Sequence, residues 1–146
     1  MRRLRGDDTG STLPLTVFYG FLALVLVLLA VAATSLYLER KRLFTVADGA
    51  ALVGAEAYDL ADLAPASDGH PRPKLDAADV RTAVAAYLGS ARVDDLESLT
   101  LERATSVDGR SATVELSAYW RPPVVSLLVP EGLRIEVTAV ARSVFD

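Results

Sequence analysis

The hydrophobic pattern of the chain is dominated by an uncharged run of thirty residues, Thr9 to Leu38, which ends at the charged sequence Glu39-Arg40-Lys41-Arg42. A helix that crosses a hydrocarbon core of about 30 Å needs about 20 apolar residues, and residues 13–38 exceed this length. Pro14 suits the first turn of a helix and Thr12 suits its N-cap. The pattern predicts an N-terminal segment of residues 1–12 and a membrane-spanning helix over residues 13–38. The side chains expected in the span include Leu13, Pro14, Phe18, Leu24, Leu28 and Leu36.

A cleavable signal peptide is the alternative interpretation of this run. Arg2, Arg3 and Arg5 form a basic n-region, and Ala30-Val31-Ala32 has the small-x-small form of a cleavage site. Cleavage after Ala32 would release a small secreted domain. The apolar run is already longer than the usual hydrophobic h-region of a signal peptide, 7 to 15 residues, before it reaches this site, and it continues beyond it. We therefore expect the span to be retained.

A second helical pattern follows the basic cluster, with apolar side chains recurring on one side from Leu43 to Ala64 and carboxylates on the other. No proline or turn sequence separates it from the span. The sequence predicts one continuous helix from about residue 14 to about residue 64, whose part over residues 39–64 is amphipathic. The residues of its apolar stripe are small enough for close packing, against the domain's own sheet, between helices of different subunits, or both. The stripe consists mainly of Ala47, Ala50, Ala51, Gly54 and Ala57.

The remaining residues, 65–146, predict a small α+β domain. The Pro-rich stretch 65–73 is expected to be a loop without regular hydrogen bonding. Asp76 predicts the N-cap of a short helix that buries Val80, Val84, Tyr87 and Leu88 and stops at Gly89. The fold class expected is a long N-terminal helix, a short second helix and a three-stranded antiparallel sheet.

The three strands are predicted from alternating apolar and polar residues after Leu96. Asp108-Gly109 predicts a hairpin with a type I′ turn, which leads into a strand over residues 112–121. The last strand is predicted over residues 133–142, where apolar and polar residues alternate as in a strand with one buried and one solvated face. The apolar stretch 124–129 between them has no predicted form.

Charge is divided unevenly along the chain. Residues 1–42 carry a net charge of +3 and residues 43–146 carry −7. An acidic domain without a basic stripe argues against a nucleic-acid partner. The chain has no cysteine, which excludes disulfides and thiolate chemistry. Both flanks of the span carry three basic residues, so the positive-inside rule gives a tie. The N-terminal amino group and the ease with which long domains translocate favour an internal N-terminus and an external domain.

The sequence predicts no catalytic, cofactor-binding or metal site and no small-molecule substrate. His70, the only histidine, lies in the Pro-rich stretch, with no second histidine or cysteine to complete a metal site. The carboxylates Asp48, Glu56, Asp59 and Asp62 follow a helix face, where they are expected to be solubilising. Residues Arg40, Lys41 and Arg42 are expected to anchor the span among lipid headgroups. Tyr119 and Trp120 form a possible contact surface, although Trp120 also suits closure of the domain's own core.

A family resemblance rests on residues 10–60. The entry Gly10-Ser11-Thr12-Leu13-Pro14, the basic exit and the run Ala47-Asp48-Gly49-Ala50-Ala51-Leu52-Val53-Gly54-Ala55 resemble the TadE/TadG-like proteins of bacterial Tad (Flp-type) pilus systems. The stretch from Trp120 to Arg142 also resembles members of this group. The resemblance implies a non-enzymatic, minor pseudopilin-like component of the bacterial cytoplasmic membrane, with its domain outside. Its implied partners are a secretion ATPase, platform proteins and the pilin.

The resemblance has one departure. Prepilin peptidase substrates have a basic leader that ends in Gly and a Glu five residues after the cut. A cut after Gly10 places Leu15 at that position, and a cut after Gly6 places Ser11 there. An unprocessed accessory component is therefore expected, in preference to a filament subunit. The other open alternative is a bitopic protein whose external domain binds a ligand.

Overall fold

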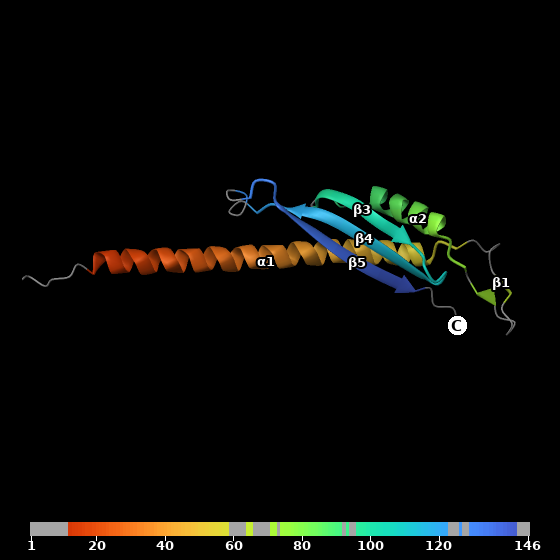
Figure 1. The fold of residues 1–146 in the computed structure, drawn as a ribbon, viewed down its shortest axis with the longest axis horizontal. Helices are drawn as coiled ribbons and strands as arrows, with labels where there is room; N and C mark the ends of the chain where they lie inside the picture. Colours follow the sequence, from red (N-terminus) through yellow and green to blue (C-terminus); the bar gives the residue numbers. More distant parts are fainter. Residues whose placement is uncertain are drawn as a thin grey trace, which may run out of the picture.

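The computed structural model describes residues 12–58, 64–65, 71–72, 74–91, 93, 96–122, 126 and 129–142. It confirms the α+β class. A long helix, α1 (Leu13–Ala55), is followed by the two-residue strands β1 (Ala64–Pro65) and β2 (Pro71–Arg72), by a second helix, α2 (Ala77–Ser90), and by three longer strands. These are β3 (Glu97–Thr105), β4 (Ser111–Trp120) and β5 (Leu133–Arg142). The C-terminal half of α1 lies along the sheet, and its N-terminal half projects beyond it (Figure 1).

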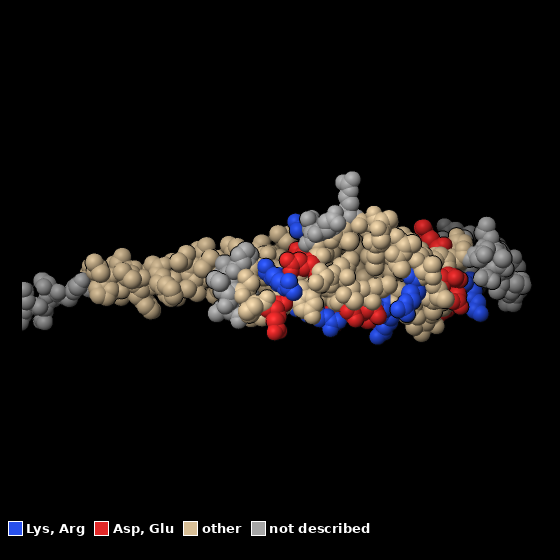
Figure 2. All heavy atoms as spheres, turned by 90° about the horizontal axis from the view of Figure 1, so that it is seen from above, with Lys and Arg blue, Asp and Glu red and all other residues tan. Residues whose placement is uncertain are grey.

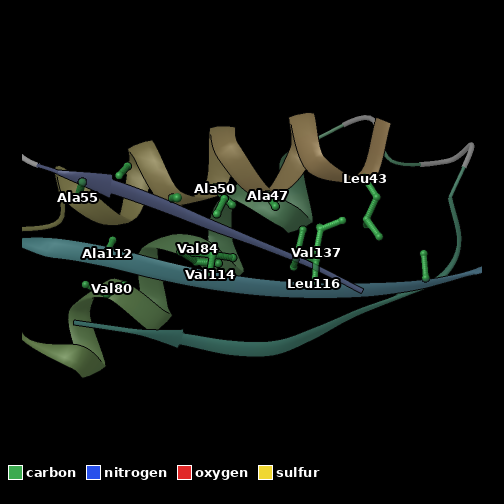
Figure 3. Packing of buried hydrophobic residues seen from close by; sticks show 14 of the residues in the cluster. Leu43, Ala47, Ala50, Ala55, Val80, Val84, Ala112, Val114, Leu116 and Val137 are labelled. Atoms are coloured by element: carbon green, nitrogen blue, oxygen red, sulfur yellow. The ribbon is translucent and has the colours of Figure 1, made fainter. Parts of the chain in front are cut away.

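The sheet is an antiparallel meander with β4 in the centre. Alternate residues of β4 and β5 point to one face, which α1 and α2 cover, as the strand spacing of two requires. The core therefore lies between this face and the two helices (Figure 3). Its fully buried side chains include Leu43, Ala47, Ala50, Val80, Val84, Val114 and Leu116.

The long helix ends earlier than the sequence predicted, at Ala55 instead of about residue 64. The amides of Glu56 and Ala57 donate to carbonyls three residues back, as in a tightening last turn. Gly54 lies beside Ala112, the second residue of β4, so the helix ends where the sheet ends. Beyond that point the helical period is carried by alanines, which gain little from burial and have no further sheet to cover.

The second helix begins as predicted, because the Asp76 carboxylate accepts a hydrogen bond from the Ala78 amide at 2.7 Å. The prediction that it stops at Gly89 is wrong, since α2 continues to Ser90. Gly89 does not have positive φ, so it is not a left-handed cap. Between the helices, β1 and β2 pair Ala64 with Arg72 and Pro65 with Pro71, although the prolines were expected to prevent regular pairing.

The β3–β4 hairpin is confirmed, but its turn is not type I′. Gly109 has φ of 65°, whereas Asp108 does not have the positive φ that a type I′ turn requires. The Asp108 carboxylate instead accepts hydrogen bonds from the amides of Arg110 and Ser111, at 2.9 and 2.7 Å, and from the Ser111 hydroxyl. These three bonds hold the pKa of Asp108 at about 2. The side chain of Asp108 therefore organises this turn.

Candidate functional site

The exposed half of α1 carries the strongest functional signal of the described residues. Its apolar window is completely unburied, and it is the one described helix long and apolar enough to cross a membrane. Leu13, Phe18 and Leu24 are each more than half exposed, although large apolar side chains are normally buried. Figure 2 shows charged side chains over the domain and uncharged residues along the projecting helix.

The domain begins to contact α1 before the uncharged run ends. Ala32 and Leu36 pack against the core, although both belong to the run. The Trp120 indole Nε1–H, at the end of β4, donates a hydrogen bond to Ser35 Oγ at 3.2 Å. Of the expected span residues, Leu13, Pro14, Phe18 and Leu24 are exposed and Leu28 is half-buried, whereas Leu36 lies against the domain. The surface available to lipid on all sides is therefore shorter than the uncharged run.

The small residues expected to pack helices lie against the chain's own sheet and second helix. Ala47, Ala50, Ala51 and Gly54 are buried, and Ala57 is half-buried just after the helix end. A Cβ atom added at Gly54 would lie 3.1 Å from both Ala112 Cβ and Val80 Cγ1. The intradomain interpretation of the stripe thus accounts for these four positions, and their side chains are not on the surface.

Tyr119 and Trp120 lie on opposite faces of the sheet. Trp120 is 6% exposed and closes the core, as its alternative interpretation expected. Tyr119 is half-exposed on the outer face, where the guanidinium carbon of Arg121 lies 5.7 Å from its ring centroid. The two residues therefore do not form one contact surface.

The outer face of the sheet carries charged side chains that pair with one another through ion pairs and hydrogen bonds. A β-bulge between Leu101 and Arg103 brings Glu102 and Arg103 to this face together. Glu102 Oε1 accepts from the Ser117 hydroxyl at 2.6 Å and from Arg134 Nη2 at 2.8 Å. These bonds lower the pKa of Glu102, the Ser117 bond having the larger effect, and the Glu102 bond raises the pKa of Arg134. Sequence periodicity could not find this network, because the bulge shifts the alternation.

Two open grooves lie along α1, and one of them is also lined by residues of the sheet. The first, here called the α1–β5 groove, has a volume of about 620 Å³. Its apolar lining comes from Ala33, Leu36, Tyr37, Leu133 and Ile135, and its polar lining from Arg40, Arg134 and Glu136. The second groove, of about 480 Å³, lies on another side of the helix and includes Ser35, Leu38 and Arg42.

The three basic residues after the uncharged run differ in their surroundings. Arg42 Nη1 lies 3.8 Å from Glu39 Oε2. Arg40 lines the α1–β5 groove and Lys41 is exposed, and neither has an ion-pair partner among the described residues. The three residues form one cluster in the sequence, but in the structure each has different surroundings.

No group of His, Cys, Asp and Glu that could hold a metal ion occurs among the described residues. Asp48 and Glu56 are exposed on and just after α1, while Asp59, Asp62 and His70 lie outside the described residues. The described part of the chain thus offers surfaces and grooves as its candidate sites.

Residues 10–57 match the model of the family described as putative Flp pilus-assembly TadE/G-like. The resemblance over residues 10–60 is thereby confirmed for the N-terminal third of the chain. The matched range of this Tad family contains all of α1 and none of the sheet, so the likeness is to the long helix. The resemblance of residues 120–142 stays a prediction. No curated protein and no solved structure matches the chain.

Proposed function

We propose that this chain is a membrane-anchored accessory component, of minor pseudopilin type, in a Tad/Flp pilus or a related type II-like secretion assembly. The observation that carries the proposal is the coincidence of the Tad family match with α1, whose N-terminal half presents an uncovered apolar surface. A helix of this kind requires lipid or other helices around it. The chain would act through protein contacts with the pilin, platform proteins and the secretion ATPase complex, without catalysis.

The lipid-embedded part of the helix, in this proposal, is Leu13 to Val31. These nineteen residues have a length of about 28 Å at a rise of 1.5 Å per residue, close to the thickness of a hydrocarbon core. Ala32 is the first residue of the run that packs against the domain. The domain would then lie directly on the membrane surface, because α1 continues into it without interruption.

The orientation proposed is an internal N-terminus and an external domain, and reporter fusions test it. Alkaline phosphatase fused after Asp146 should be active, and a fluorescent protein that matures only in the cytoplasm should stay dark at the same position. The reverse result would contradict the orientation and the pilus function together. N-terminal sequencing of the membrane-purified chain tests retention, and a mature end at Ala33 would identify a secreted domain.

Deletion of the gene tests the accessory function in the native bacterium. We expect loss of surface pili, with restoration by the full chain but not by residues 33–146. Mass spectrometry of sheared filaments should find the chain absent from the filament body, because neither candidate cut provides the Glu expected of a processed pilin. Normal piliation of the deletion strain would contradict the proposal, and abundant chain in the filaments would contradict the accessory form of it.

A further inference from the structure

The α1–β5 groove lies at the depth of lipid headgroups if Leu13 to Val31 crosses the membrane, an assignment that rests on the proposed function. Arg40 is nine residues beyond Val31, about 13 Å along the helix axis. Side chains of a helix lean toward its N-terminus, and a long arginine side chain extends several ångströms back in that direction. The guanidinium of Arg40 would therefore reach the phosphate layer.

The apolar wall of the groove continues the lipid-facing surface of the helix. Leu26, Leu29, Ala33 and Tyr37 follow one face of α1 in steps of three and four residues, and Arg40 ends the row. Leu29 is 61% exposed and Tyr37 is 65% exposed, so nothing within the described chain covers this row. Tyrosine at this depth is typical of membrane interfaces. An acyl chain lying along the row would enter the groove without leaving apolar surroundings.

The charged side chains in and beside the groove differ in how they are paired. Arg134 Nη2 is already 2.8 Å from Glu102 Oε1 and 2.9 Å from Glu136 Oε1, so the charge of Arg134 is fully engaged by two carboxylates and these three side chains together carry a net charge of −1. Arg40 has no acidic partner among the described residues. It is thus the cation of the groove with free donors, and a phosphate diester is the anion that a membrane provides next to an apolar chain.

We propose that the α1–β5 groove binds one phospholipid from the leaflet on the domain's side. Arg40 pairs with the lipid phosphate, while Ala33, Leu36 and Leu133 contact the glycerol and the upper part of an acyl chain. The bound lipid seals the space between the helix and the first residues of β5. The proposal assigns lipid binding to Arg40 and not to Lys41, which follows it in sequence but does not line the groove.

Native mass spectrometry of the full chain released from phosphatidylglycerol-containing nanodiscs tests the proposal. The wild type should retain one phospholipid per chain, and Arg40→Gln should lower the retained fraction at least tenfold. Lys41→Gln is the matched control and should retain lipid like the wild type. Ala33→Phe fills the apolar end while leaving Arg40 in place, and it should also reduce retention. The near-ultraviolet circular dichroism of Trp120 checks that each variant keeps its helix–sheet contact.

Each alternative result is decisive. Equal retention by wild type and Arg40→Gln, or equal losses for Arg40→Gln and Lys41→Gln, would overturn the groove site. Retention unaffected by Ala33→Phe would also overturn it, because phosphate binding alone does not need the apolar end. Alkaline carbonate extraction separates this failure from failure of the proposed function. If the chain stays in the membrane but Arg40→Gln has no effect, only the groove site is contradicted. If carbonate releases the chain, both the groove site and the proposed function are contradicted.

Discussion

At the scale of single residues, the close approach of α1 to the rest of the domain depends on two glycines, which have no side chain. Gly54 faces Ala112 of β4 and Val80 and Val84 of α2, and Gly49 faces the hydroxyl of Tyr87. The space next to both glycines is already filled, so the reason for glycine at these positions is packing and not backbone conformation. Gly89 differs from them because no atom lies within 4 Å of a Cβ built there.

Gly54→Val should lower the free energy of unfolding by about 1–3 kcal/mol, because the added atoms would overpack three buried neighbours. The matched substitution Gly89→Ala should raise it by about 0.5 kcal/mol through helix propensity. Urea unfolding in micelles, followed by circular dichroism, measures both. A Gly54→Val variant as stable as the wild type would show that α1 can move away from α2.

Asp108 predicts a pH dependence of stability. Its folded pKa, about 2, lies below the ordinary value of 3.8, so its contribution is present above pH 4 and is lost as the pH falls toward 2. Asp108→Asn should therefore be less stable than the wild type at pH 6 and should lose less stability between pH 5 and pH 2.5. Urea midpoints at these pH values measure the effect. Parallel losses in the two proteins would contradict it.

At the scale of elements, the decisive contact joins β4 to α1 across 85 positions of sequence, from Trp120 to Ser35. It links the end of β4 to a residue within the uncharged run of α1. Ser35 stands among apolar residues and gives no local sign of this contact. Its hydroxyl oxygen is the hydrogen-bond acceptor for the buried indole N–H.

Ser35→Ala should destabilise the domain by about 1–2 kcal/mol, because it leaves the buried Trp120 N–H without its acceptor. Thr34→Ala is the control, since the exposed Thr34 hydroxyl bonds only to the Ala30 carbonyl of its own helix. In a Trp120→Phe background the effect of Ser35→Ala should largely disappear. A double-mutant cycle measures this coupling, and equal effects in both backgrounds would mean that the hydrogen bond contributes nothing.

The sequence predicted those elements whose signals are local. Asp76 marks its helix through its own side chain, and the alternation in residues 133–142 defines β5 to the residue. The end of α1 could not be predicted, because alanines keep the helical period beyond Ala55 whether or not a sheet lies beneath them. The grooves and the Glu102 network depend on pairing register and on a bulge, and neither leaves a periodic trace in one strand.

At the scale of the whole molecule, the charge pattern and the packing give different ends for the membrane span that we propose. Charge begins at Glu39, whereas domain contacts begin at Ala32. Ala32 to Leu38 is therefore uncharged for two reasons in the proposed arrangement, because part of it faces the sheet and part would face the membrane interface. A span assigned from hydropathy alone includes this section of the helix.

Single cysteines can locate the boundary, because the natural chain has none. In nanodiscs, where both membrane faces are open, Leu24→Cys should react with a charged maleimide at least tenfold more slowly than Leu52→Cys. The two native leucines are similarly exposed, at 56% and 53%, so lipid is the difference. Leu38→Cys should react like Leu52→Cys. A Leu38→Cys as protected as Leu24→Cys would extend the span to the charged cluster.

If the chain spans the membrane as proposed, the unbroken course of α1 from Leu13 to Ala55 makes the molecule a rigid lever. Membrane helices tilt by about 20° on average, and no joint separates the lipid-facing half of this one from the half that carries the sheet. The twenty-four residues from Ala32 to Ala55 extend about 36 Å, so such a tilt moves the far end of the domain sideways by about 12 Å. Whatever sets the angle of the helix in the bilayer therefore also sets which neighbours the sheet can reach.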